Sequence, residues 1–151
     1  MLQKKIKLNC LTSKDAIQQV RSGNYEIPKL KNLTINLTEW SLEQMIRKGG
    51  EADFIFLPSD ITHPKRMHVS NNRLITAFSF NKPVIATSLE SYKMYSEYFI
   101  DFDSIEAIDY FLKNKVKKIN YKEVVDNYKF EKISLIWYET YKEITQIKWK
   151  I

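Results

Sequence analysis

The residues best suited to chemistry lie in a polar segment that leads into an apolar one. A Ser-Asn-Asn-Arg run occupies positions 70–73, and two cations precede it by a few residues. Serine and asparagine commonly begin helices, where free backbone N–H groups and the helix dipole attract anions. A phosphate group would fit here. The candidate residues are Ser70, Asn71, Asn72, Arg73, Lys65 and Arg66.

Each of these residues also has an ordinary structural role. Ser70 can cap the helix without any ligand, which is a frequent use of serine. Arg73 can form a surface salt bridge, and such exposed pairs are common and weak. The spacing alone leaves capping and anion binding both open.

Other chemistries find little support in the sequence. His63 and His68 share a loop with Asp60, but their spacing matches no recognised metal site. Neither the dinucleotide-binding G-x-G-x-x-G motif nor the G-x-x-x-x-G-K-[ST] phosphate loop occurs. Ser59 lacks a G-x-S-x-G motif, and Cys10 has no histidine close in sequence. We expect no cofactor and no bound metal.

The elements that must position the candidate residues follow a strand–helix alternation. Apolar stretches predict strands at 5–12, 33–40, 52–59, 83–87 and 99–102. Helices are predicted between them, at 13–22, 41–48, 70–80, 92–99 and 104–114. This alternation is typical of a doubly wound, Rossmann-like parallel sheet of about five strands flanked by helices. Ligands of such sheets bind outside the carboxyl ends of the strands.

Two local signals refine these elements. Ser41 and Gln44 form a plausible capping box for the second helix, and Gly49 and Gly50 are expected to end it. The uninterrupted apolar run of the third strand, 52–59, indicates burial on both faces, as in parallel sheets covered by helices.

The C-terminal part, residues 118–151, differs from the strand–helix core of about residues 1–115. Helices are predicted at 121–128 and 130–144. In the second helix an apolar stripe recurs at helical spacing, formed by Phe130, Ile133, Trp137, Tyr141 and Ile144. The stripe can pack on the protein's own sheet, or it can also brace a partner domain.

Length and composition set further limits. The 151 residues suit a single domain over 1–151. The one cysteine, Cys10, excludes an internal disulfide and is expected to be a small buried residue, which fits a reducing compartment. No apolar run approaches the ~20 residues of a membrane span, and no signal peptide is recognisable. We expect a cytoplasmic protein.

The chain is basic, with a formal net charge of +6 and a pI of about 9.2. Such a balance favours phosphorylated ligands, an anionic membrane surface or nucleic acid, and it also suits a solvated lysine-rich face. No base-reading module is recognisable, so nucleic acid is not an expected partner. Peripheral contact with the inner face of a membrane is compatible with this charge.

The 70–73 run belongs to a longer sequence pattern. The stretch "ADFIFLPSD" is followed by a cationic loop, by "SNNRLITAFSFNKPVIAT" and by "LESY". In this order the pattern resembles the C-terminal, donor-binding half of GT-B fold glycosyltransferases, which carry S-x-N-[RK]-L and A-x-G-x-P-V-[IV]-A segments. The resemblance extends from about Thr38 to Tyr92.

The resemblance implies a nucleotide-sugar site that needs no metal. Ser70, Asn72 and Arg73 match positions near the donor diphosphate, with Lys65 or Arg66 as cationic partners. A weaker set of nucleotide- or sugar-binding positions comprises Ser59, Asp60, Thr76, Thr87 and Tyr92. The implied partner is an N-terminal acceptor-binding domain or a separate subunit, and the implied setting is glycan or surface polysaccharide biosynthesis.

Several positions depart from the family pattern. His68 and Thr76 stand where many retaining members carry glutamates, so the chain is not expected to be an active enzyme alone. Asn81 replaces the usual glycine, which asparagine can do because it also adopts left-handed backbone angles. The alternative expectation is a non-catalytic Rossmann-like interaction domain, half of a split or degenerate glycosyltransferase, which docks a partner protein.

Overall fold

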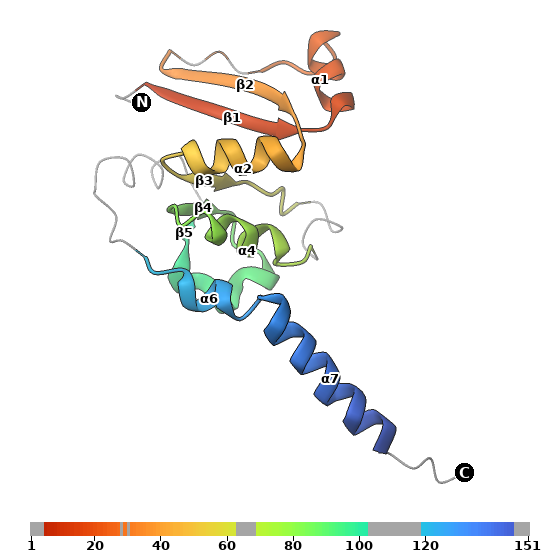
Figure 1. Ribbon diagram of the computed structural model, residues 1–151. Coiled ribbons are helices and arrows are strands. Elements are labelled where there is room, and N and C mark those ends of the chain that lie inside the picture. The colour runs from red at the N-terminus through yellow and green to blue at the C-terminus, as the bar shows by residue number, and fades with distance from the viewer. Residues whose placement is uncertain (1–4, 28, 30, 63–68, 103–118, 147–151) are drawn as a thin grey trace. The chain divides into compact units, whose positions relative to one another are not determined.

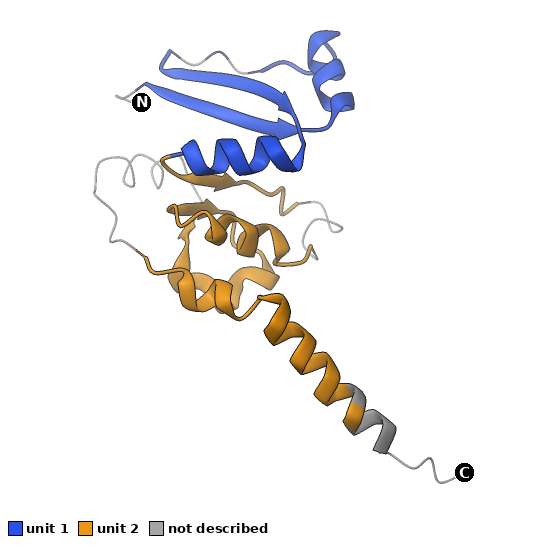
Figure 2. Cartoon of the chain, viewed as in Figure 1, with its two compact units in different colours: residues 1–52 blue, residues 53–151 orange. Residues whose placement is uncertain are grey.

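The computed structural model describes residues 5–27, 29, 31–62, 69–102 and 119–146 (Figure 1). The chain forms two compact units, Met1–Ala52 and Asp53–Ile151 (Figure 2). Each unit contains a parallel sheet with helices. The α/β class is therefore confirmed, whereas the expectation of one domain over the whole chain stays a prediction.

The first unit is a strand–helix–strand–helix segment. Its elements are β1 (Ile6–Thr12), α1 (Lys14–Arg21), β2 (Leu33–Glu39) and α2 (Leu42–Glu51). The strands β1 and β2 pair in parallel, from Ile6 opposite Leu33 to Thr12 opposite Glu39. Among the described residues of this unit only Gly49 is buried. Cys10 is only partly buried, which is still enough to raise the pKa of its thiol.

The helix α2 confirms one sequence signal and corrects another. The Ser41 hydroxyl accepts a hydrogen bond from the Gln44 N–H at 3.1 Å, as a capping serine does. The reciprocal half of the capping box is absent, because the Gln44 side chain accepts from Arg47 instead. The prediction that Gly49 and Gly50 end the helix is wrong. Both remain helical, and the helix ends at Glu51.

The second unit carries the candidate site. Three short strands pair in parallel in the order β3-β4-β5: β3 (Ile55–Leu57), β4 (Val84–Ala86) and β5 (Ile100–Asp101). The helix α4 (Asn72–Ser79) connects β3 to β4, and the 3-10 helix η1 (Glu90–Tyr98) connects β4 to β5. Two helices follow, α6 (Lys122–Asp126) and α7 (Phe130–Gln146). The predicted helix at 104–114 lies outside the described residues.

The core of this unit forms between β4 and the inner faces of α4, η1 and α6. Its fully buried members include Leu74, Phe78, Val84, Ala86 and Tyr92. All of β4 is buried, but β3 is only partly buried, so the prediction of burial on both faces of the third strand is wrong. The described sheet explains the difference, because β4 is its central strand and β3 lies at its edge.

The turn between α4 and β4 follows the expectation from the sequence. Asn81 has a φ of 51°, and so adopts the left-handed conformation that glycine would otherwise supply. Its N–H donates to the Phe78 carbonyl, which closes the end of α4. The next connection differs from the prediction in type: residues 90–98 form a 3-10 helix with a kink at Tyr95.

The helix α7 leaves most of its apolar residues exposed. Phe130 is 80% exposed and Trp137 71%, whereas Ile133 is partly buried. Packing of the stripe on the protein's own sheet is therefore wrong for Phe130 and Trp137. The side chains of Tyr141 and Ile144 lie outside the described set. No helix within the described ranges is both long and apolar enough to cross a membrane.

Candidate functional site

The amino-terminal end of α4 lies after the parallel strand β3 and has no side-chain cap. Asn71 occupies the cap position, with a φ of −75° and a ψ of 0°, and no side-chain hydrogen bond caps the helix. Ser70 precedes this position and is exposed. The interpretation of Ser70 as the capping residue is therefore wrong.

The backbone at this helix end offers several donors. The first helical hydrogen bond runs from the Ile75 N–H to the Asn71 carbonyl at 3.0 Å. The N–H groups of Asn72, Arg73 and Leu74 precede it, so they have no acceptor within the helix. Together with the helix dipole, such groups form a site suited to an anion.

Three of the four predicted residues of the 70–73 run are exposed around these donors. Ser70, Asn72 and Arg73 each present their side chains to solvent. No described residue forms a salt bridge with Arg73. The hydroxyl, amide and guanidinium of these residues can each donate hydrogen bonds to phosphate oxygens.

Asn71 has a different role from the one predicted. Its side-chain amide donates to the Tyr128 hydroxyl at 2.9 Å and to the Tyr95 hydroxyl at 3.3 Å. The two tyrosine hydroxyls also hydrogen-bond each other. Both N–H bonds of the amide are therefore used inside the protein. The Asn71 amide therefore anchors the start of α4.

Within this hydrogen-bonded group, Asn71 with Tyr95 and Tyr128, the Tyr95 hydroxyl holds its proton more strongly than an ordinary tyrosine does. Burial and then the hydrogen bond with Tyr128 raise the pKa of Tyr95 to about 12, although the Asn71 amide opposes the shift. The sequence pattern did not point to either tyrosine. Tyr95 lies in η1 and Tyr128 between α6 and α7, and they are 33 residues apart, so no local spacing could reveal the contact.

The weaker candidates at the strand ends mostly hold the sheet edge together. The Ser59 N–H donates to the Thr87 hydroxyl at 3.0 Å, which links the end of β3 to the end of β4. In the same way the Ser88 N–H donates to the Asp101 carboxylate at 3.1 Å, which links β4 to β5. Asp60 accepts from the N–H and the hydroxyl of Thr62 in a local turn.

The remaining candidates lie in the core, in α4 or outside the described residues. Tyr92 is fully buried in the core, and its hydroxyl has no hydrogen-bond partner among the described residues. Burial raises the pKa of Tyr92, and the charge of Arg73 partly opposes this shift, so Arg73 lies within electrostatic reach. Thr76 is partly buried in α4, one turn after Arg73. Lys65 and Arg66 lie outside the described residues, as do His63 and His68.

No family model matches the chain, and no curated protein or solved structure matches it either. In the described part of the chain, no group of three or more histidine, cysteine, aspartate or glutamate residues could hold a metal ion. Among the described residues, the N–H groups at the start of α4 are the donors best arranged to contact an anion.

Proposed function

We propose that the chain is the nucleotide-sugar-binding domain of a glycosyltransferase and that the amino-terminal end of α4 binds the donor diphosphate. One observation carries the proposal: α4 begins without a side-chain cap, and its open N–H groups lie among Ser70, Asn72 and Arg73. Ordinary helices satisfy these donors with a serine or aspartate. A phosphate group would satisfy them here.

The charges of the described residues support a diphosphate. Arg73 can contact phosphate oxygens in a bidentate manner, which adds geometric selectivity to charge. The helix dipole favours the same negative charge within the first turn. In a glycosyl transfer these groups would stabilise the leaving nucleotide diphosphate as negative charge develops on it.

The neighbouring strand ends would then hold the rest of the donor. Ser59 and Thr87 lie at the carboxyl ends of β3 and β4, on the edge where α4 begins. Ligands of doubly wound sheets bind outside this edge. In this proposal β1 to β5 belong to one doubly wound, Rossmann-like sheet of five strands, which the parallel pairing within each described sheet supports.

The domain would act with a partner and not alone. Thr76 stands where the retaining family members carry a glutamate. An N-terminal acceptor-binding domain, or a separate subunit, would bring the acceptor and the catalytic base for glycan or surface polysaccharide assembly. The net charge of +6 would favour an anionic membrane surface, where lipid-linked acceptors lie.

Calorimetric titration of UDP, GDP and their sugars into the full chain tests the proposal. Because Arg73 is exposed, Arg73→Ala should leave the fold intact and weaken diphosphate binding about 10- to 100-fold, as expected for hydrogen bonds to a charged group. Arg21→Ala, at an exposed arginine in α1, is the matched control and should bind normally. Absence of binding at millimolar nucleotide would sink the proposal.

A second candidate function is a non-catalytic interaction domain. The observation that favours it is the exposed apolar surface of α7, formed by Phe130, Leu135, Ile136, Trp137 and Tyr138. Large apolar side chains gathered on one element often mark a protein interface. This candidate predicts no nucleotide binding, together with a stoichiometric complex with a separate acceptor-domain polypeptide that the Phe130→Ser/Trp137→Ser double variant loses.

A further inference from the structure

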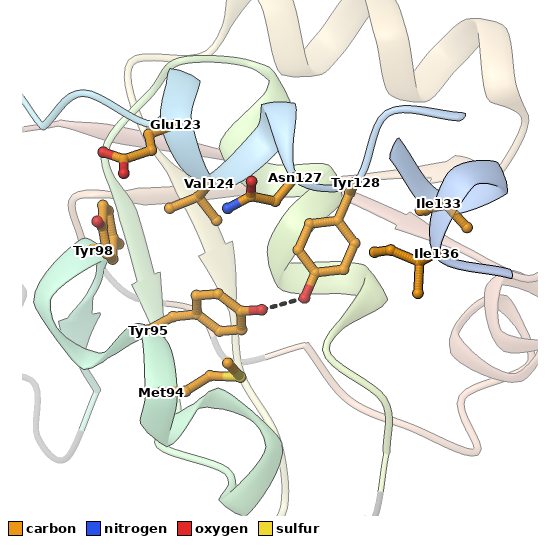
Figure 3. A pocket seen from close by; sticks show the side chains of 9 residues that line it. All are labelled: Met94, Tyr95, Tyr98, Glu123, Val124, Asn127, Tyr128, Ile133 and Ile136. Atoms are coloured by element: carbon orange, nitrogen blue, oxygen red, sulfur yellow. Dashed lines mark hydrogen bonds between the residues drawn. The ribbon is translucent and has the colours of Figure 1, made fainter. Parts of the chain in front are cut away.

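A cavity of about 520 Å³ lies between η1, α6 and the start of α7 (Figure 3). Its volume falls within the range of small-molecule sites, roughly 300–1,000 Å³. Apolar and aromatic side chains dominate its walls, with few polar groups, which is also typical of such sites. The lining residues are Met94, Tyr95, Tyr98, Glu123, Val124, Asn127, Tyr128, Ile133 and Ile136.

Two of the aromatic rings in the wall are held in place. The hydroxyls of Tyr95 and Tyr128 hydrogen-bond each other and both accept from the Asn71 amide (Figure 3 draws the tyrosine pair). Each ring is therefore fixed by its polar end while the rest of the side chain lines the cavity. Fixed side chains lose little conformational entropy when a ligand binds.

One acidic side chain lines the cavity. Glu123 is the one lining residue with a charge, and no described residue forms an ion pair with it. Two lysines lie nearby but do not line the cavity. Lys129 pairs with Asp126 at 2.7 Å, and Lys132 donates to the Asn127 side-chain oxygen at 2.9 Å.

We propose that this cavity binds a small organic cation, an alkyl- or arylammonium ion. Tyrosine rings attract a cation through their π faces, and a carboxylate that no described residue pairs adds a charge of the opposite sign. Tyr95, Tyr98 and Tyr128 supply the rings, and Glu123 the carboxylate. The apolar body of the ligand would contact the aliphatic part of the wall, formed by Met94, Val124, Ile133 and Ile136.

The occupant cannot be the diphosphate proposed for the start of α4, because an anion would meet Glu123 and the electron-rich rings. The cavity would thus be a second site of opposite charge preference. It does not depend on the glycosyltransferase proposal, since nucleotide binding at α4 could fail and leave the cation site intact.

Three probes with a common ring and different charges test the inference on the full chain. These are benzyltrimethylammonium, neutral benzyl alcohol and anionic phenylacetate, titrated while the methionine methyl signals are followed by NMR. We expect the cation to bind roughly tenfold more tightly than the alcohol and the anion to bind most weakly. The Met94 methyl should shift, whereas Met45, in the first unit, should not.

Two variants test whether Glu123 causes the preference for a cation. Glu123→Gln should weaken binding of the cation by about 2- to 5-fold, as expected for an exposed ion pair, and leave benzyl alcohol unaffected. Glu139→Gln, at an exposed glutamate of α7 outside the cavity, is the matched control. The inference is overturned if the three probes bind equally, if the Met94 methyl does not respond, or if both variants have the same effect.

Discussion

The helices α2 and α4 are stabilised in opposite ways. α2 begins with a serine cap at Ser41 but leaves Leu42 and Ile46 exposed. α4 has no side-chain cap but buries Leu74 and Phe78 completely or nearly so. The contrast indicates that α4 is stabilised by the packing of its buried face and not by a side-chain cap.

The largest expected effect is on packing. Phe78→Ala removes a ring that stacks on Tyr121 with centroids 4.8 Å apart, and should lower the free energy of unfolding by about 3–5 kcal/mol. Ile46→Ala, at an exposed residue of α2, should cost less than about 1 kcal/mol. Urea denaturation measures both. Equal losses would remove the contrast between the two helices.

A smaller effect is expected at the anchor of α4. Tyr128→Phe removes the hydroxyl that bonds Asn71 and Tyr95, and should destabilise the protein by about 1 kcal/mol. It should also lower the pKa of Tyr95 from about 12 towards its ordinary value. Spectrophotometric titration of tyrosinate in the wild type and the variant would detect that shift.

The same pKa predicts a dependence of stability on alkaline pH. Because folding raises the pKa of Tyr95 from 10.0 to about 12, the stability it contributes is complete below pH 10. It is lost progressively as the pH rises through this interval, since the unfolded chain ionises first. In Tyr128→Phe the loss between these pH values should be smaller; an identical loss would show that the hydroxyl pair does not cause the shift.

The smallest expected effects on stability concern the serines at the starts of α2 and α4. Ser41→Ala should lower the free energy of unfolding by about 1 kcal/mol because it removes a cap. Ser70→Ala should change it by less than about 0.5 kcal/mol, since Ser70 is exposed and makes no capping bond. Denaturation of the two variants side by side checks this. A larger loss for Ser70→Ala would mean that Ser70 does cap α4.

Local signals predicted much of the secondary structure. Ser41 caps its helix as expected, and Asn81 adopts the left-handed turn. These features depend on a few neighbouring residues, so the sequence displays them. The end of α2 was predicted wrongly from Gly49 and Gly50, because a helix can contain glycine where no left-handed turn is required.

The rest depends on residues far apart in the chain. Asn71 contacts Tyr128 across 57 residues, and no local pattern reveals that its amide is used inside the protein. The apolar stripe of α7 indicates that a face needs cover, but it does not say what covers it. The sequence predicts that an anion binds at the start of α4. The absence of a side-chain cap there is visible only in the structure.

Titration of UDP into the wild-type chain and into Arg73→Ala tests the central claim most directly. The account predicts binding to the wild type and a loss of about 10- to 100-fold in the variant, with Arg21→Ala unchanged. Equal UDP affinity for the wild type and Arg73→Ala, or no binding to the wild type at millimolar UDP, would contradict it.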